Sequence, residues 1–224
     1  MNNRLLCAFL MLCASASALA EDCGDLTNHY GPFDYTRPEN KDKLPTVEAY
    51  HFTREVEALI GGKSSSLGGD IDYTLGVFPN HHRALNSMSK LFVRNKNRRP
   101  EGATRSMECY FDRAHRLSPK DSVVLVLDGI YNYKLGKIDK ALEKTKAAAE
   151  LSPDSSQVNY NLGLIYLEKK DYASALKHAQ AAYAKNFPLP GLKKKLEKAG
   201  KWVPPPAQPA AETAAQEPAA TPAP

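Results

Sequence analysis

The chain has 224 residues and carries 30 Lys and Arg against 25 Asp and Glu, a formal net charge of +5 at pH 7. A net charge this small argues against a dedicated nucleic-acid-binding protein, which would gather many basic residues on one face. A hydrophobic fraction of 42% is enough to bury a core over most of the length. We therefore expect an ordinary globular domain with appended tails and no nucleic-acid partner.

Residues 1–20 have the layout of a secretory signal peptide. One positive charge at Arg4 precedes an apolar stretch over residues 5–12, and the segment ends in small residues at Ala18 and Ala20, as a cleavage site requires. The apolar stretch is too short to cross a bilayer, for which about 20 residues are needed. We predict cleavage after Ala20, export to the periplasm with secretion as the second choice, and no membrane span in the mature chain.

Cleavage would leave two cysteines, Cys23 and Cys109. An even pair in an exported protein predicts a disulfide, because oxidising compartments favour the bond. In the chain-entropy model a loop of this size stabilises the fold by on the order of 4 kcal/mol. The alternative is two unpaired thiols, with Cys109 acting as a small buried hydrophobic residue.

Residues 21–80 show the least regular pattern. One helix is expected within residues 46–60, where Thr53 is a plausible N-cap for residues 54–60. The glycine-rich residues 61–69 are expected to form a flexible loop. Asp70 is expected to cap a short helix that runs toward Phe78.

From residue 81 onward the hydrophobic pattern is helical. The periodicity predicts helices over residues 122–135, 138–151, 156–169 and 172–186. Gly136 is a natural left-handed C-cap, and Pro188 stops the last of these helices. Residues 81–94 and 104–119 are predicted as a further helix pair, and residues 190–202 as a final helix.

The strongest signal is internal repetition at a period of 34 residues. Gly129 recurs as Gly163, Ala141 as Ala175, and Ala148 as Ala182. Small residues at such positions let two antiparallel helices approach closely where they cross. A fixed period of this length is typical of arrays of helical hairpins.

These residues resemble the tetratricopeptide repeat family, whose unit is a 34-residue helical hairpin. The resemblance implies an all-α fold, a right-handed superhelix of antiparallel hairpins with about three units and a C-terminal capping helix. The units would be 122–155 and 156–189, preceded by a degenerate first repeat at 81–120 and followed by the cap at 190–202. The matching positions are Gly129, Tyr133, Gly136, Ala141, Ala148 and Pro153 in one unit, and Leu162, Gly163, Tyr166, Ala175, Ala179 and Ala182 in the next.

Two positions depart from that family pattern. Asp128 stands where the family usually has Leu, and Asn132 stands where Tyr is usual. A buried Asp128 would need a partner, since a lone buried carboxylate is strongly disfavoured. The alternative is an exposed or helix-capping position.

The resemblance also implies a concave groove lined by the first helix of each unit. Asn161 stands where some members use an Asn to hold the backbone of a bound peptide. A groove so apolar and aromatic suits an apolar peptide or helix, although its side chains could instead pack against the N-terminal segment. The expected lining residues are Val126, Ile130, Tyr133, Tyr160, Asn161 and Leu164.

We therefore predict a non-enzymatic scaffold or adaptor that binds a protein or peptide through this groove and uses no cofactor. No Ser-His-Asp or Cys-His arrangement stands out in the sequence. The alternative is a periplasmic protein that binds a metal or small ligand in its N-terminal segment, with His81 and His82 as weak candidate ligands. Adjacent residues on a helix do not share a face, which makes that pair a poor metal site.

The last segment, residues 203–224, contains eight Ala, seven Pro and no aromatic residue. Such a stretch cannot bury enough apolar surface to offset the entropy lost on ordering. We predict a disordered tail.

Overall fold

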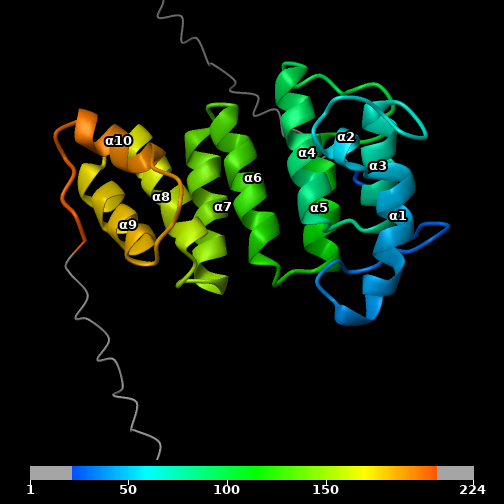
Figure 1. Ribbon diagram of the computed structural model, residues 1–224, viewed down its shortest axis with the longest axis horizontal. Coiled ribbons are helices and arrows are strands. Elements are labelled where there is room, and N and C mark those ends of the chain that lie inside the picture. Colours follow the sequence, from blue (N-terminus) through cyan, green and yellow to red (C-terminus); the bar gives the residue numbers. More distant parts are fainter. Residues whose placement is uncertain (1–21, 206–224) are drawn as a thin grey trace, which may run out of the picture.

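A computed structural model describes residues 22–205. These residues form helices and connecting turns without a β-strand, which confirms the predicted all-α fold. The helices form a row of hairpins, with the N-terminal elements at one end of the row and α9 and α10 at the other (Figure 1). Between residues 22 and 205, no helix is both long and apolar enough to cross a bilayer. The predicted signal peptide and residues 206–224 of the predicted tail lie outside the described residues.

One short 3-10 helix precedes the α-helices. In chain order the elements are the 3-10 helix η1 (Pro38–Lys43) and the α-helices α1 (Leu44–His51), α2 (Arg54–Glu57), α3 (Leu67–Val77), α4 (His82–Arg94), α5 (Met107–Leu117), α6 (Ser122–Lys134), α7 (Ile138–Leu151), α8 (Ser156–Glu168), α9 (Tyr172–Ala184) and α10 (Gly191–Lys198). The helices predicted from residue 81 onward are confirmed, with ends that differ by a few residues.

The first helix of each hairpin ends on a left-handed residue. In the last two hairpins these residues are Gly136, with φ of 73°, and Lys170, with φ of 61°. The following residue closes the turn: Lys137 N donates to Asn132 O at 2.9 Å, and the N–H of residue 171 donates to the carbonyl of residue 166 at 3.0 Å. These bonds satisfy carbonyls that a helix end would otherwise leave without partners.

The turn that joins one hairpin to the next recurs three times, at Pro79, Pro119 and Pro153. Each time the residue before the proline has nearly the same conformation, with φ between −145° and −125° and ψ between 66° and 82°. The residue two after the proline caps the next helix from an extended conformation. α3 therefore stands before α4 as α5 stands before α6. The chain forms a hairpin-like layer earlier than the sequence predicted, and the predicted boundary at residue 80 falls inside a turn.

The glycine-rich region was predicted wrongly in part. Ser66, not Asp70, caps α3, accepting a hydrogen bond from Gly69 N at 3.3 Å, so Gly68 and Gly69 are helical rather than part of a loop. A Cβ on Gly68 would overlap the backbone of Glu101. Glycine is therefore needed here because the chain after α4 crosses the start of α3 at very short range.

Small residues set the spacing of the C-terminal hairpins. A Cβ on Gly129 would overlap Thr145 Oγ1, whose hydroxyl donates to Ala141 O at 2.8 Å. A Cβ on Gly163 would lie 3.3 Å from Ala175 O. The close helix crossings predicted from the 34-residue repetition are therefore present in both hairpins.

An N-terminal strap, residues 22–28, lies along α5. Cys23 and Cys109 form a disulfide across 86 residues, which confirms the predicted bond. Arg113, only 2% exposed, donates to Asp25 O, and Arg116 Nη2 donates to Gly24 O at 2.7 Å.

Thr53 also caps α2 as predicted, accepting from Val56 N, although that helix stops at Glu57.

Candidate protein-binding groove

A small hollow opens between α6 and α8, the first helices of adjacent hairpins. Its volume is about 70 Å³, enough for a small apolar side chain. Ile130 and Tyr133 line it from α6, and Asn161 and Leu164 line it from α8. The structure thus brings together four of the six residues predicted to line the groove.

The other two predicted groove residues, Val126 and Tyr160, do not line this hollow. Val126 is 2% exposed and packs with Val158 and Leu162 between the hairpins. Tyr160 is 8% exposed, because the chain after α9 folds over it and places the Phe187 ring 4.6 Å from its own. The prediction that these two side chains face a partner is corrected: both belong to the core.

The same face becomes basic toward the N-terminus. Counted from the recurring turns, Lys90 on α4 holds the position of Ile130 on α6, and Arg94 holds the position of Lys134. Lys90 and Arg94 are exposed, and Lys134 is exposed at the edge of the hollow. We call Lys90, Arg94 and the residues lining the hollow the concave row. Within the described residues 22–205, the N-terminal segment does not fill the hollow, since every residue that lines it comes from α6 or α8.

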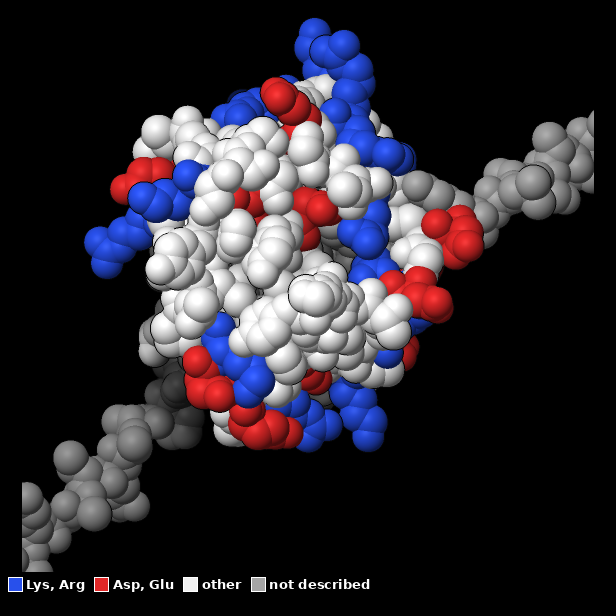
Figure 2. Space-filling model, turned by 90° about the vertical axis from the view of Figure 1, so that its right-hand side faces the viewer, with Lys and Arg blue, Asp and Glu red and all other residues white. Residues whose placement is uncertain are grey.

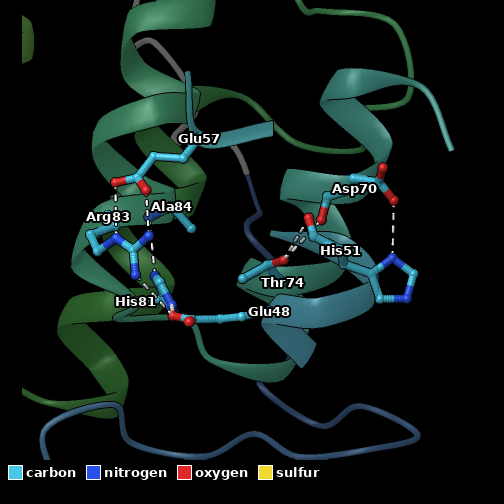
Figure 3. A network of polar contacts seen from close by, with 8 residues as sticks. All are labelled: Glu48, His51, Glu57, Asp70, Thr74, His81, Arg83 and Ala84. Carbon is cyan, nitrogen blue, oxygen red and sulfur yellow. Dashed lines mark hydrogen bonds and ion pairs between the residues drawn. The ribbon is translucent and has the colours of Figure 1, made fainter. Parts of the chain in front are cut away.

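A polar network that the sequence did not predict holds α4 against α1 and α2 (Figure 3). His81 is fully buried, and its Nδ1 accepts from Ala84 N at 3.1 Å. That bond requires the proton on Nε2, which lies 2.9 Å from Glu48 Oε1 and donates to it. Burial lowers the pKa of His81 despite the neighbouring carboxylate. Arg83 joins Glu48 to Glu57.

His82 belongs to a different cluster. Its Nε2 lies 2.7 Å from Asp121 Oδ2, and Asn80 Nδ2 donates to Asp34 Oδ1 at 2.7 Å and to the same Asp121 oxygen at 3.2 Å. These contacts fix the N-terminal loop against two of the recurring turns. His81 and His82 therefore have separate carboxylate partners, and they do not form a common ligand set.

Asp70, predicted as a helix cap, instead organises the loop before α3. It is completely buried, its Oδ1 lies 3.0 Å from His51 Nδ1, and its Oδ2 accepts from the backbone N–H groups of Lys63 and Ser64. Burial raises the pKa of the Asp70 carboxyl, but these hydrogen bonds outweigh burial and hold the pKa below its ordinary value. Stacking of His51 on Tyr73, with ring centres 3.8 Å apart, completes the contact between α1 and α3.

Asp128 is buried at the junction of the irregular and regular hairpins. A hollow of about 190 Å³ between α5, α6 and α7 is lined by Asp128, His115 and Lys144, among others. Asn132 Nδ2 donates to Asp128 Oδ1 at 2.7 Å. Burial raises the pKa of Asp128 to about 6, against the opposing charges of Lys144 and Lys140. Of the two positions expected for Asp128, the buried and partnered one is found.

Comparison with known families decides what these hairpins are. Residues 129–189, which contain the C-terminal part of α6, all of α7, α8 and α9 and the hollow between α6 and α8, match the family model described as tetratricopeptide repeat. The chain carries tetratricopeptide repeats. No curated protein matches the chain.

Tetratricopeptide repeats generally mediate protein–protein interaction, and the family is typically non-catalytic. The match covers the regular hairpins and leaves out α1–α5, where the polar clusters lie. Within residues 22–205, no group of three or more His, Cys, Asp or Glu side chains could hold a metal ion. A metal or small-ligand site in the N-terminal segment stays a prediction.

The polar clusters left little signal in the sequence. Each links residues 19 to 46 positions apart through side chains that no motif connects. The one usable signal was the proline at position 79, whose surroundings repeat those of Pro119 and Pro153 at an interval of 40 rather than 34 residues.

Proposed function

We propose that the chain is an exported adaptor of the periplasm that binds a protein partner through the concave row. The observation that carries this proposal is the hollow between α6 and α8. Four of the residues expected to line a groove border this hollow together, and none of its lining residues between 22 and 205 comes from the N-terminal segment.

The chemistry of the concave row favours a partner segment with one apolar anchor and acidic neighbours. Ile130, Tyr133 and Leu164 supply apolar walls, and the hollow of about 70 Å³ accepts a single side chain. Asn161 Nδ2 donates to Gln157 O at 2.9 Å, leaving its carbonyl oxygen for a backbone N–H of the partner. The exposed Lys90 and Arg94 would attract carboxylates that follow the anchor, since opposite charges steer association.

Leu164→Arg tests the groove. The substitution places a long charged side chain in the hollow, while Leu164 is only partly buried and a charged head there can reach water. The matched control is Leu151→Arg at the end of α7, where the leucine is 43% exposed and lies away from the concave row. Each variant is compared with the unchanged chain by co-purification from envelope extract, and helicity is checked by circular dichroism.

A protein retained by the unchanged chain and by Leu151→Arg, but lost with Leu164→Arg, supports the proposal. Retention of the same proteins by Leu164→Arg at undiminished yield contradicts it. Tyr160→Ala is not a suitable probe, because removing a buried aromatic ring disturbs the core.

Export is tested separately, by the mass of the protein recovered from the periplasmic fraction. We expect a chain that begins at Glu21 and is two mass units lighter than the reduced form, about the mass of two hydrogens, because the Cys23–Cys109 bond removes them. A chain that still begins at Met1, or that stays in the cytoplasm, would rule out export without affecting the groove.

A further inference from the structure

The two ends of the row of hairpins differ in charge. The end built from α1 and α3 shows a broad uncharged area, with a few acidic groups near its middle and most of the Lys and Arg nearer its margin (Figure 2). The opposite end carries α10 and the residue that follows Gly200, where five lysines stand against a single Glu197. They are Lys193, Lys194, Lys195, Lys198 and Lys201.

α10 is fixed in an orientation that turns these lysines outward. Leu192 and Leu196 on its inner side are completely buried, and both pack in the same cluster as Tyr160 and Ala179 of the last hairpin. The lysines are therefore exposed. Within residues 22–205, Lys194, Lys195 and Lys198 make no ion pair, so their charges face solvent.

Exposed apolar side chains lie beside the lysines. Leu189 and Val203 are each 53% exposed. They are held near the end of α9: Tyr183 Oη donates to Leu189 O at 2.8 Å, and Gln180 Nε2 donates to Val203 O at 3.1 Å. The Trp202 ring, partly exposed, stands 5.6 Å from the Tyr183 ring.

From this arrangement we infer that the α10 end, meaning the five lysines with Leu189, Trp202 and Val203, docks on the surface of a bilayer that contains anionic lipids. Lysines near an anionic bilayer each contribute about 1 kcal/mol of attraction. Tryptophan and aliphatic side chains at the same level enter the interface between headgroups and acyl chains. The site is independent of the concave row, so the two proposals can fail separately.

Two features favour a lipid surface over an acidic protein. The exposed lysines of α10 and the exposed apolar side chains of Leu189 and Val203 are offered at the same end of the molecule, a combination that suits the charged and apolar layers of a bilayer surface. Arginine, which binds protein carboxylates through paired hydrogen bonds, is absent after residue 116, since the last arginine in the chain is Arg116. An acidic polymer would satisfy the lysines but would leave Leu189 and Val203 without an apolar contact.

The chain contains one tryptophan, Trp202, which makes its fluorescence a direct probe of this end. The experiment uses residues 21–224, which include every described residue and omit the apolar residues 5–12. The chain is titrated with vesicles of phosphatidylglycerol mixed with phosphatidylcholine, and with vesicles of phosphatidylcholine alone. We expect binding and a blue shift of the emission with the anionic vesicles only, both reversed by high salt.

The lysine variant is Lys194→Gln combined with Lys195→Gln and Lys198→Gln. At about 1 kcal/mol per lysine, roughly fivefold each, the partition coefficient should fall about 100-fold. The matched control replaces the exposed Lys63, Lys120 and Lys146 by Gln, which changes the net charge equally at other places. This control should retain most of the binding.

Three outcomes overturn the proposal. They are the absence of binding to anionic vesicles, an equal loss of binding in the two triple variants, and binding to polyglutamate without any vesicle-dependent shift of the Trp202 emission. The last result would assign the lysines to an acidic protein instead. Leu189→Gln adds a finer test, since it should weaken binding to anionic vesicles while leaving its salt dependence in place.

Discussion

The N-terminal part of the row, up to α5, and the hairpins from α6 onward are held together by different means. In the N-terminal part, side chains join residues far apart in sequence, such as Arg113 with Asp25 and Tyr110 with Asp72, and a disulfide closes the strap. In the C-terminal hairpins the key contacts are small: Gly129 faces Thr145, and Gly163 faces Ala175. In the C-terminal hairpins, small residues let the helices pack closely, and few polar links between distant residues are needed. In the N-terminal part, which lacks such a repeat, a disulfide and buried polar networks hold the helices together.

The largest expected effect comes from removing the disulfide of the N-terminal part. Replacing Cys23 and Cys109 together by Ala should lower the free energy of unfolding by about 4 kcal/mol, because the unfolded chain regains the entropy of a loop of this length. Amide hydrogen exchange should report the loss in α3–α5 and leave α8 and α9 protected. The reduced unchanged chain serves as control and should behave like the variant. Equal loss of protection throughout would mean that the two parts unfold as one unit.

A second prediction concerns Asp128, at the boundary between the two parts. Its pKa is about 6 in the folded chain and about 3.9 when unfolded, so the folded state binds more protons between these values. The free energy of unfolding should therefore fall as pH rises from 4 to 6. Asp128→Leu, which restores the residue type found at Leu162, should stabilise the chain by about 2–3 kcal/mol at pH 8.

Urea unfolding at pH 4, 6 and 8 measures this effect. Asp128→Asn is the matched control, because it removes the charge at nearly constant size and should also abolish the pH dependence. A stability gain from Asp128→Leu that is the same at pH 4 and pH 8 would show that packing, and not the buried charge, is responsible.

The smallest expected effect concerns the close helix crossing between Gly129 and Thr145 in the C-terminal hairpins. Gly129→Ala should destabilise by about 1–3 kcal/mol, since its methyl group would overlap Thr145 Oγ1. Thr145→Ala in the same chain should recover most of that loss, because Ala179 occupies the corresponding place in the next hairpin. Thermal unfolding of the two single variants and the double variant gives the coupling. Additive losses in the double variant would refute the direct contact.

The same division explains what could be predicted from the sequence. The 34-residue recurrence of Gly129 and Ala141 fixed the helices of the last two hairpins, because close crossings depend on residue size, which a sequence displays. α4 ends at Arg94 and α5 begins only at Met107, so the period there lengthens and the earlier layer with α3 was missed.

At the candidate groove, a different feature escaped prediction: the segment that covers one of the expected groove residues. The family resemblance implied which residues of α6 and α8 would line a groove, and of these Ile130 and Leu164 lie beside one hollow. It could not reveal that the chain near Phe187 and Gly191 returns to cover Tyr160. What covers a helix face depends on distant segments, and those leave no periodic trace.

The recurring turn at Pro79, Pro119 and Pro153 has a consequence for the length of the array. The backbone has nearly the same conformation before and after each of these turns. A hairpin that lies between two of the turns could therefore be removed or duplicated without changing the conformation of the turn that remains. Excising Lys120–Pro153 would join the hairpin of α4 and α5 directly to that of α8 and α9 through an unchanged connection. Recombination at these prolines would thus add or remove whole hairpins without requiring a new connecting loop.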